Sequence, residues 1–235
     1  MSTEIQPRTG IILECGWGRL LFAHTFASPE AVAEAILDEK PGQRDIAFYL
    51  NDPQIVLNCA PQELFLDPSH CYRITFDSYQ PATTPPLGFT TGAIEHPEDL
   101  QAINRIYQSH GMVPVDPDFV WAHRQTGGFD YIVARTLDDG RVLGVAMGVD
   151  HIKHFDDLGN GSSLWALAVD AHAEHPGIGE HLVRALIENY QQAGRSQLDL
   201  SVMHTNDSAI ALYDKLGFKR VAVFAVKCRN PINES

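Results

Sequence analysis

The stretch LAVDAHAEHPGIGEHLVRAL, residues 167–186, joins an apolar strand pattern to a helix pattern through a turn with two glycines. Apolar side chains recur at helical spacing after the turn, at Ile178, Leu182, Val183 and Leu186. Glycine lets the backbone approach a ligand closely, and the free N–H groups at a helix start attract anions. The stretch alone fits a phosphate-binding turn and a plain helix start equally well, because Glu174 precedes it and the turn holds no Lys or Arg.

A second motif lies one helix and one strand further on, in SVMHTNDSAIALYDKLGF, residues 201–218. It places an asparagine after a strand end, followed by a dense helical pattern: Asn206, Ala209, Leu212, Tyr213, Lys215, Gly217 and Phe218. Together the motifs resemble those of GNAT-superfamily N-acetyltransferases, V-x-P-x-x-(Q/R)-G-x-G-(I/V)-G-x-x-L and N-x-x-A-x-x-L-Y-x-K-x-G-F. The first is matched at Val169, Gly177, Ile178, Gly179 and Leu182, the second almost throughout, and the resemblance covers about residues 89–227.

Charge and composition narrow the classes of function. The 17 basic residues stand against 30 acidic ones, a net charge of −13, which argues against a nucleic-acid partner because such a partner needs a basic face. No apolar run is long enough to predict a membrane span, and the N-terminal MSTEIQPRTG lacks a targeting pattern, so we expect a cytoplasmic protein without a membrane partner. We expect no disulfide framework and no metal site, because the histidines and the four cysteines lack ligand spacing: Cys15, Cys59, Cys71 and Cys228.

A proline-rich linker at residues 77–88 divides the chain. Residues 1–76 predict a small β-α-β-β segment that packs on the rest, its helix opened by Ser28 and Pro29. Residues 89–235 predict the order β-α-α-β-β-β-α-β-α-β, with a final strand in KRVAVFAVK. The fold class is therefore α/β (α+β). The resemblance implies a mixed, mostly antiparallel sheet with a splayed central strand pair, flanked by helices.

The family resemblance implies acetyl-CoA (coenzyme A) as the cofactor. Backbone amides from His175 to Glu180 would hold its pyrophosphate, and the strand Leu164–Val169 would splay from Asp199–Val202 to receive the pantetheine arm. Tyr213 would be the general acid for the departing thiolate, and Asn206 would bond the cofactor arm. Tyr213 is also consistent with a core aromatic, and Asn206 with a helix N-cap. The full set expected to contact the cofactor is Leu167, Ala168, Val169, His175, Pro176, Gly177, Ile178, Gly179, Glu180, Asn206, Ala209, Tyr213 and Lys215.

Two positions depart from the family pattern. Glu174 stands where Gln or Arg is usual, so the phosphates would rely on backbone amides. Trp165 stands where many members carry a Glu as general base. His204, at the end of the strand facing the thioester, is the candidate base, because the ordinary pKa of histidine is near neutral. A water held by backbone carbonyls and a plain surface histidine are the alternatives.

Phrases across almost the whole chain, such as LECGWGRLLF and INRIYQSHGMVPVDPDFVW, resemble the N-terminal acetyltransferase half of N-acetylglutaminylglutamine synthetase-type bacterial proteins. That resemblance implies acetylation of the α-amine of a small amino acid or dipeptide, with glutamine or glutaminylglutamine favoured. It also implies an ATP-grasp ligase, fused or as a partner, and a homodimer is a further expectation. Five basic residues are candidates to meet the acceptor carboxylate: Arg105, Arg124, Lys153, Lys227 and Arg229.

Two other functions stay open on the sequence alone. An acyl-CoA-binding sensor or docking module without turnover would explain Glu174 and Trp165. Acetylation of a protein N-terminus or lysine is the third possibility, which an open acceptor groove would favour and a deep pocket would not.

Overall fold

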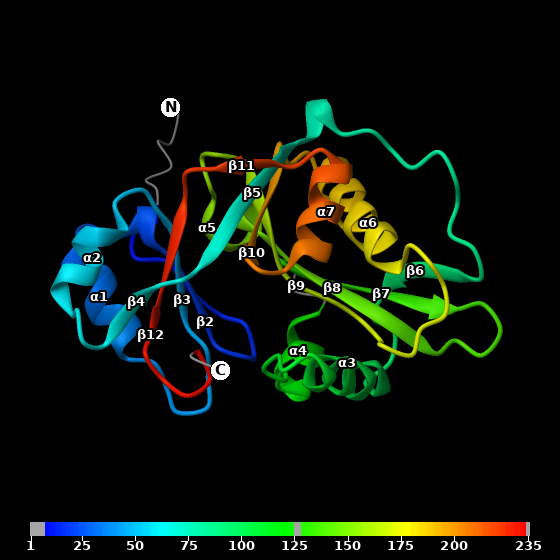
Figure 1. Cartoon of the computed structure of the whole chain (residues 1–235), viewed down its shortest axis with the longest axis horizontal. Helices are drawn as coiled ribbons and strands as arrows, with labels where there is room; N and C mark the ends of the chain where they lie inside the picture. Colours follow the sequence, from blue (N-terminus) through cyan, green and yellow to red (C-terminus); the bar gives the residue numbers. More distant parts are fainter. Residues whose placement is uncertain (1–7, 125–127, 234–235) are drawn as a thin grey trace, which may run out of the picture.

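The computed structural model describes residues 8–124 and 128–233 of the chain. In this part the chain forms two sheets that stand beside one another, one of five strands and one of seven (Figure 1). No helix in the same part is long and apolar enough to cross a bilayer. Most of the N-terminal stretch that lacks a targeting pattern, residues 1–7, lies outside the described residues.

The smaller sheet is built mostly from the first third of the chain, but its fourth strand comes from the C-terminal end. The order is β1 (Ile12–Glu14), β2 (Arg19–Phe22), β3 (Ile46–Leu50), β12 (Phe224–Cys228) and β4 (Leu64–Leu66). Two helices pack on this sheet, α1 (Pro29–Leu37) and α2 (Pro53–Cys59), and their apolar side chains form one core with it. The predicted cap of α1 is confirmed, since the Ser28 hydroxyl accepts a hydrogen bond from the amide of Ala31 at 3.3 Å.

The larger sheet contains the expected GNAT-like arrangement. Its order is β11 (Lys219–Val221), β5 (Ser69–Thr75), β10 (Gln197–Met203), β9 (Gly161–Val169), β8 (Val142–Asp150), β7 (Phe129–Thr136) and β6 (Phe89–Ala93). Every neighbouring pair is antiparallel except β9 and β10. The mixed, mostly antiparallel sheet predicted from the sequence is therefore confirmed.

Helices cover both faces of the larger sheet (Figure 1). One apolar cluster joins one face to α6 (Ile178–Gln192) and α7 (Asp207–Leu216). A second cluster joins the opposite face to α3 (Glu98–Ser109) and α4 (Pro117–His123), and it continues into the smaller sheet through Trp17 and Phe48. The short helix α5 (His151–Phe155) connects β8 to β9. Two short 3-10 turns, Ala23–Thr25 and Phe76–Ser78, complete the elements.

The two parallel strands separate partway along their length. Strands β9 and β10 pair from Gly161 with Gln197 as far as Leu164 with Leu200. Beyond that point Ala166–Val169 pairs only with β8, and Ser201–Met203 only with β5. The splay expected between these strands is thus confirmed, and it leaves one edge of β9 without a strand partner.

The sheets do not follow the division of the chain at residues 77–88. Strand β5 precedes that linker but pairs with β10 in the larger sheet. The run KRVAVFAVK, expected as one strand, is instead two: β11 stays in the larger sheet, whereas β12 enters the smaller one between β3 and β4. The chain therefore crosses between the sheets twice, which ties them together. Three elements were not predicted: α2, β4 and α5.

Candidate active site

The turn before α6 has the conformation that an anion-binding helix start requires. Gly177 is the N-cap of α6 and adopts a left-handed φ of 82°, which favours glycine. The first-turn amides of Ile178, Gly179 and Glu180 have no carbonyl partner inside the helix, because the ladder of i to i−4 bonds begins later. A Cβ on Gly179 would meet Leu212 and Val169 at 3.6 and 3.7 Å, so this glycine lies where α6, α7 and β9 meet.

The carboxylate of Glu180 at this helix start is neutralised by two basic side chains. Lys215 on α7 approaches it at 2.6 Å and Arg184 at 3.0 Å. The hydrogen bond from Lys215 is the main cause that lowers the pKa of Glu180. The sequence suggested a turn without basic side chains, whereas the fold supplies two beside it. Glu174 is exposed.

The residues that precede the helix pack against the start of β6. The His175 ring lies edge-on to Phe89 at 6.1 Å between centroids, and a Cβ on Gly88 would come within 2.6 Å of that ring. The Nδ1 atom of His175 is buried without a hydrogen-bond partner in the described part of the chain. His175 and Pro176 therefore shape the turn, while the amides that follow them stay available.

Tyr213 and Asn206 each have a structural role in the fold. Tyr213 is buried in the core beside Phe218, at 5.5 Å between ring centroids, and burial raises the pKa of its hydroxyl well above the ordinary value. Asn206 is the N-cap of α7, because its side-chain oxygen accepts a hydrogen bond from the amide of Ala209 at 3.2 Å. Both structural alternatives raised from the sequence are thus present. Neither prevents a second role, since Tyr213 keeps its proton at neutral pH.

The imidazole of His204 is directed to the side of β10 that faces β5. Its Nδ1 atom lies 2.8 Å from the carbonyl oxygen of Pro68. Its ring lies edge-on to that of His70 on β5, at 6.3 Å between centroids. The splay opens on the other side of β10, towards β9. This position is the one expected of a surface histidine, and it gives the assignment of His204 as general base no support.

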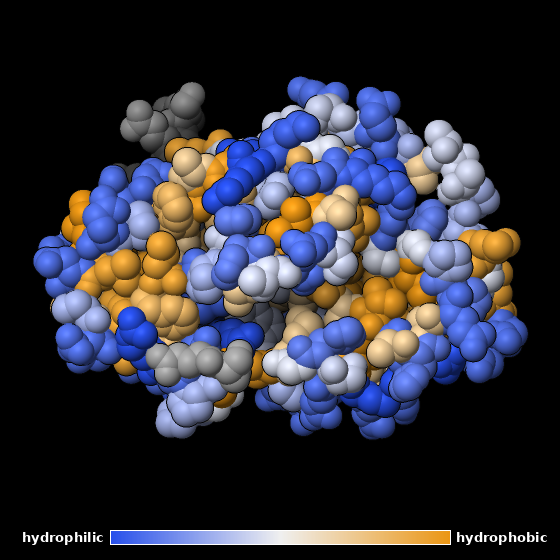
Figure 2. All heavy atoms as spheres, viewed as in Figure 1, coloured by the Kyte–Doolittle hydropathy of each residue, from blue (hydrophilic) through white to orange (hydrophobic). Residues whose placement is uncertain are grey.

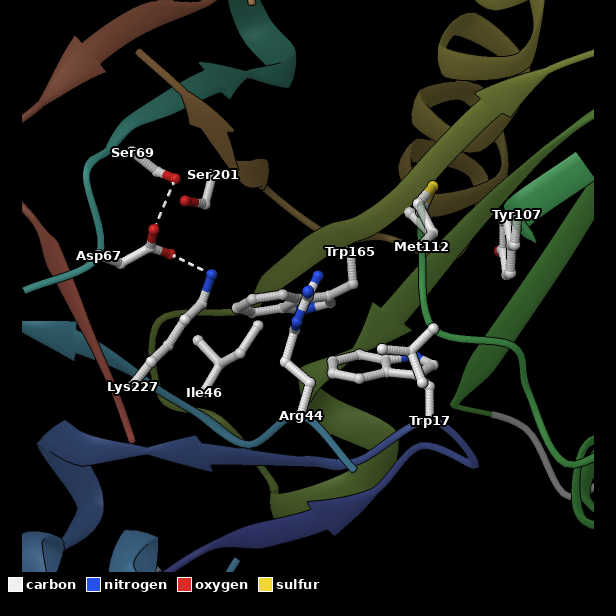
Figure 3. A pocket seen from close by; sticks show the side chains of 12 residues that line it. Trp17, Arg44, Ile46, Asp67, Ser69, Tyr107, Met112, Trp165, Ser201 and Lys227 are labelled. Carbon is white, nitrogen blue, oxygen red and sulfur yellow. Dashed lines mark hydrogen bonds and ion pairs between the residues drawn. The ribbon is translucent and has the colours of Figure 1, made fainter. Parts of the chain in front are cut away.

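A pocket of about 150 Å³ opens where β9 and β10 separate (Figure 3). Trp165 and Ala166 of β9 and Ser201 of β10 form one side of it, and Tyr107 of α3 and the following loop form another. The smaller sheet and its flanking segments line a further side. The lining is Trp17, Arg44, Ile46, Asp67, Ser69, Tyr107, Met112, Val113, Trp165, Ala166, Ser201 and Lys227.

Three charged side chains line this pocket among the described residues. Lys227 and Asp67 form an ion pair at 2.8 Å, and the Ser69 hydroxyl donates to the same carboxylate at 2.9 Å. Arg44 is the third, and its guanidinium donates to Asn233 Oδ1 and to the carbonyl of Ile232. Two cations and one carboxylate leave the lining with a surplus of one positive charge.

Of the five basic residues expected at the acceptor, the structure brings only Lys227 to this pocket. Arg105 is paired with Asp170 at 2.8 Å, and Lys153 lies 3.8 Å from Asp150. The other two stack on aromatic rings, Arg124 over Trp121 and Arg229 over Phe65. Sequence reasoning missed Trp17, Arg44 and Asp67. The pair of glycines around Trp17 was a usable signal, since a Cβ on Gly18 would lie 1.9 Å from the carbonyl oxygen of Arg44.

Trp165 has a defined orientation at the splay. Its indole N–H donates to the Ser163 hydroxyl at 2.7 Å, and that hydroxyl lies 2.8 Å from Nε2 of the buried His151. The ring also packs edge-on against Phe48 of β3, at 5.0 Å between centroids. Trp165 thus contributes a wall between the two sheets.

Both the sequence and the fold match those of known proteins. The model of the acetyltransferase (GNAT) family matches residues 98–218, more than half of the chain. Ribosomal protein bS18-alanine N-acetyltransferase of Escherichia coli (strain K12) is 36% identical over 62 residues, which are 26% of this chain and 42% of that protein. The match thus spans less than half of the length of this relative.

Two solved structures have the same fold at low sequence identity. A putative acetyltransferase of the GNAT family from Novosphingobium aromaticivorans DSM 12444 superimposes with a TM-score of 0.57 at 16% identity, covering 92% of this chain and 85% of that one. A GCN5-related N-acetyltransferase from Sphaerobacter thermophilus gives 0.55 at 15%, covering 80% of this chain and 59% of that one. With the family model matched over both motifs, the chain belongs to the acetyltransferase (GNAT) family.

Proposed function

We propose that this acetyltransferase uses acetyl-CoA to acetylate the α-amine of a small amino acid or dipeptide. The observation that carries the proposal is the pocket at the splay, because the smaller sheet lines it on the side opposite β9 and β10. A pocket of about 150 Å³ with walls from both sheets matches a compact acceptor better than a protein surface. Glutamine or glutaminylglutamine is favoured on the sequence resemblance alone.

The chain's own residues fit a coenzyme A thioester. The left-handed Gly177 and the free amides of Ile178, Gly179 and Glu180 suit its pyrophosphate, and Lys215 and Arg184 offset the carboxylate of Glu180. The edge of β9 that lacks a strand partner, at Leu167, Ala168 and Val169, suits the amides of a pantetheine arm, and His110 Nε2 lies 2.7 Å from the carbonyl oxygen of Val169. When bound, acetyl-CoA supplies an acetyl group activated as a thioester.

The pocket favours the reactive form of the acceptor. An α-amine attacks only after it has lost its proton, and a surplus positive charge lowers the pKa of a bound amine. The charged lining of Arg44, Lys227 and Asp67 carries such a surplus. No carboxylate at position 165 is required for this deprotonation, since the first proton leaves before attack through water at the mouth of the pocket. The second proton would leave the nitrogen through the same water as the amide forms, and Tyr213 would regain its proton from solvent.

Tyr213 is the proposed general acid. Burial keeps its hydroxyl protonated, and α7 starts directly after β10, at the edge of the splay. The hydroxyl proton would pass to the departing thiolate sulfur, which makes the thiol a better leaving group. Asn206 would hold the start of α7 in place and contact the cofactor arm. Lys215 and Ala209 complete the proposed cofactor surface on α7.

Acetylation of a protein N-terminus is a second candidate. One observation favours it: the E. coli relative acts on an alanine of ribosomal protein bS18. An acyl-CoA sensor is the third candidate, motivated by Trp165 in place of a carboxylate. A homodimer, an ATP-grasp ligase partner and a cytoplasmic location also remain predictions.

Thiol release from acetyl-CoA, measured with a panel of free amino acids and dipeptides, tests the proposal. Ser201→Leu fills the pocket from β10, so we expect the acceptor KM to rise at least tenfold while acetyl-CoA affinity stays within twofold. The exposed Ser78→Leu is the matched control and should change neither value. Acetyl-CoA binding by calorimetry without thiol release for any amine would support the sensor and contradict the transferase proposal.

A further inference from the structure

Arg44 is held rigidly at the wall of the pocket by its own backbone. Its amide donates to the carbonyl oxygen of Trp17 at 3.2 Å, and its carbonyl oxygen lies against Gly18. Gly18 has a φ of 152° and no room for a Cβ, which would stand 1.9 Å from that oxygen. The close contact fixes the Arg44 backbone relative to Trp17, a second lining residue of the same pocket.

The C-terminal segment holds the guanidinium of Arg44. Nε donates to Asn233 Oδ1 at 3.1 Å, and an Nη donates to the carbonyl of Ile232 at 2.6 Å. Asn233 is itself fixed, because its amide donates to Asn230 Oδ1 and its side chain to the carbonyl of Cys228, both at 2.8 Å. Both acceptors of the guanidinium are neutral, so they orient the charge without compensating it.

Arg44 forms no ion pair in the part of the chain that the structure describes. Burial is the main cause that lowers its pKa, and Asp67 and Glu39 offset this effect only at longer range. Both carboxylates have closer partners: Lys227 for Asp67, and the amide of Asp45 for Glu39. A desolvated cation without a paired anion is costly for a folded protein, and arginine recognises carboxylates through two parallel N–H donors.

Other buried donors face the same pocket. The indole N–H of Trp17, 8% exposed, and the hydroxyl of Tyr107, 1% exposed, have no hydrogen-bond partner among the described residues. Figure 3 shows the Arg44 side chain directed towards Trp165, with Trp17 beside it. A pocket with spare donors and a spare cation is completed by a ligand that brings acceptor oxygens and a negative charge.

We propose that Arg44 determines acceptor specificity by binding the carboxylate of the acceptor, and that Asn233 positions the guanidinium for this contact. The inference rests on the proposed function in one respect, that the amine acceptor occupies this pocket. It assigns the carboxylate to a residue of the segment between β2 and β3, outside the region that the family model covers. Amines without a neighbouring carboxylate are then poor acceptors.

The test compares an α-amino acid acceptor with its carboxamide, in the wild-type protein and in Arg44→Met. We expect wild type to prefer the carboxylate form by at least about 30-fold in kcat/KM, since truncating one partner of a buried charge pair has effects of this order or larger. In Arg44→Met this preference should fall below threefold, because the rate with the carboxylate form should fall much more than the rate with the carboxamide. Arg44→Lys keeps the charge but loses the fork of donors, so an intermediate preference is expected. The exposed Arg141→Met serves as control.

Calorimetry with the same ligand pair separates the inference from the proposed function. If the carboxylate form binds wild type but not a folded Arg44→Met, without any acetyl transfer, the inference stands and the transferase proposal fails. If wild type and Arg44→Met prefer the carboxylate form over the carboxamide to the same degree, Arg44 does not determine acceptor specificity. The same conclusion follows if the wild-type protein binds the two ligands equally well. Asn233→Ala should raise the acceptor KM with kcat kept and with carboxylate preference reduced. An unchanged preference would show that Asn233 does not position Arg44.

Discussion

Tyr49→Phe removes a single hydrogen bond that joins the two sheets near the pocket. Tyr49 on β3 donates from its hydroxyl to Asp199 Oδ2 on β10 at 2.8 Å. The same carboxylate accepts two bonds from Arg73 on β5, at 2.6 and 2.8 Å, so it stays paired when the hydroxyl is lost. Burial, followed by the charge of Asp199, raises the pKa of Tyr49 well above its ordinary value, so the donor persists through the neutral range.

The expected loss of stability follows from this geometry. A buried hydrogen bond to a charged group contributes about 1.5–3 kcal/mol, and Asp199 is 2% exposed. We therefore expect urea unfolding to show the free energy of unfolding reduced by about 2 kcal/mol, with an unchanged m-value. Tyr49 lies on β3, which begins at Ile46 of the pocket lining and closely follows Arg44. Loosening β3 should therefore raise the acceptor KM, while the KM for acetyl-CoA stays constant.

Tyr79→Phe is the matched control for this change. Its hydroxyl also donates to a carboxylate at 2.8 Å, that of Glu188, but the bond ties the 77–88 linker to α6. Stability should fall here too, without any change in acceptor KM. A change under about 0.5 kcal/mol in Tyr49→Phe would refute the reasoning. An equal rise of acceptor KM in both variants would show that the effect is not local to the sheet junction.

Three further predictions concern the cofactor side and the stability of the larger sheet. Tyr213→Phe should lower kcat by about 100-fold or more with the fold kept, as circular dichroism can check, and full activity would exclude the general acid. Gly177→Ala places a Cβ on a left-handed residue, so calorimetry should show weaker acetyl-CoA binding; unchanged affinity would separate this turn from the cofactor. Burial alone would raise the pKa of Asp99, but Arg135 and two backbone amides outweigh it and hold this pKa at about 2. The stabilisation by Asp99 should thus be complete above its unfolded value of about 3.9 and vanish as pH falls through about 2, so the stability deficit of Asp99→Asn should shrink along that range in urea unfolding. A deficit independent of pH would contradict this assignment.

The helices were predictable because their signals are local. Apolar residues at helical spacing mark α3, α6 and α7, and the caps at Ser28 and Asp116 act within three residues of themselves. The hairpin between β7 and β8 is marked in the same way by its Asp-Gly turn. The splay and the sheet type followed from the family resemblance, since no pattern within one strand tells which strand is its neighbour.

The exchange of strands between the sheets could not be predicted. The run from Lys219 to Cys228 contains no glycine or proline, so nothing local marks the place where β11 ends and β12 begins. The break is imposed by tertiary contacts, because Val226 pairs with Leu66 while Val221 pairs with Cys71. Likewise α2 has only seven residues, too few for a helical period to stand out.

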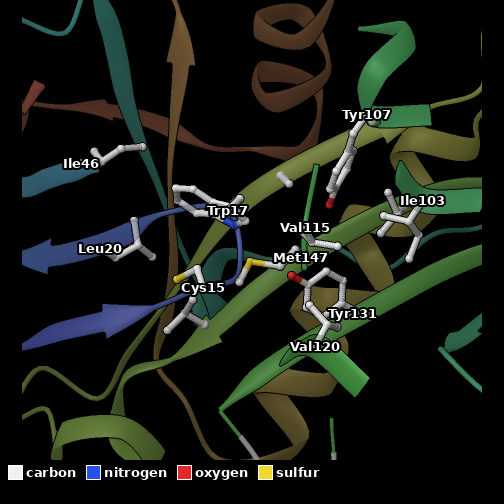
Figure 4. Packing of buried hydrophobic residues seen from close by; sticks show 14 of the residues in the cluster. Cys15, Trp17, Leu20, Ile46, Ile103, Tyr107, Val115, Val120, Tyr131 and Met147 are labelled. Atoms are coloured by element: carbon white, nitrogen blue, oxygen red, sulfur yellow. The ribbon is translucent and has the colours of Figure 1, made fainter. Parts of the chain in front are cut away.

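The cofactor side of the candidate site could be located from local sequence signals, whereas the acceptor pocket could not. The helix-start turn and Asn206 lie in contiguous motifs, so the sequence located the cofactor side. The pocket lining instead comes from separate segments, with Trp17, Arg44 and Asp67 brought together by the smaller sheet (Figure 4 shows Trp17 packed among residues of both sheets). Of the basic residues chosen from the sequence, only Lys227 lines the pocket, and the half-buried Arg44 was missed. The charge of Arg44 could be recognised as unusual only once its burial and partners were visible.

On the side shown in Figure 2, hydrophilic residues are interspersed with apolar ones over both sheets. The formal net charge of −13 disfavours an extended polyanion as partner. The acceptor is therefore sought among small molecules and peptides.

A competition assay tests the central claim most directly. The protein is given acetyl-CoA and an equimolar mixture of free amino acids, dipeptides including glutaminylglutamine, and a ten-residue peptide beginning with alanine. Mass spectrometry then ranks the acetylated products by relative kcat/KM. We predict acetylation of the α-nitrogen of a free amino acid or dipeptide at least tenfold ahead of the peptide. Preferred acetylation of the ten-residue peptide would contradict the assignment of this pocket to a small acceptor.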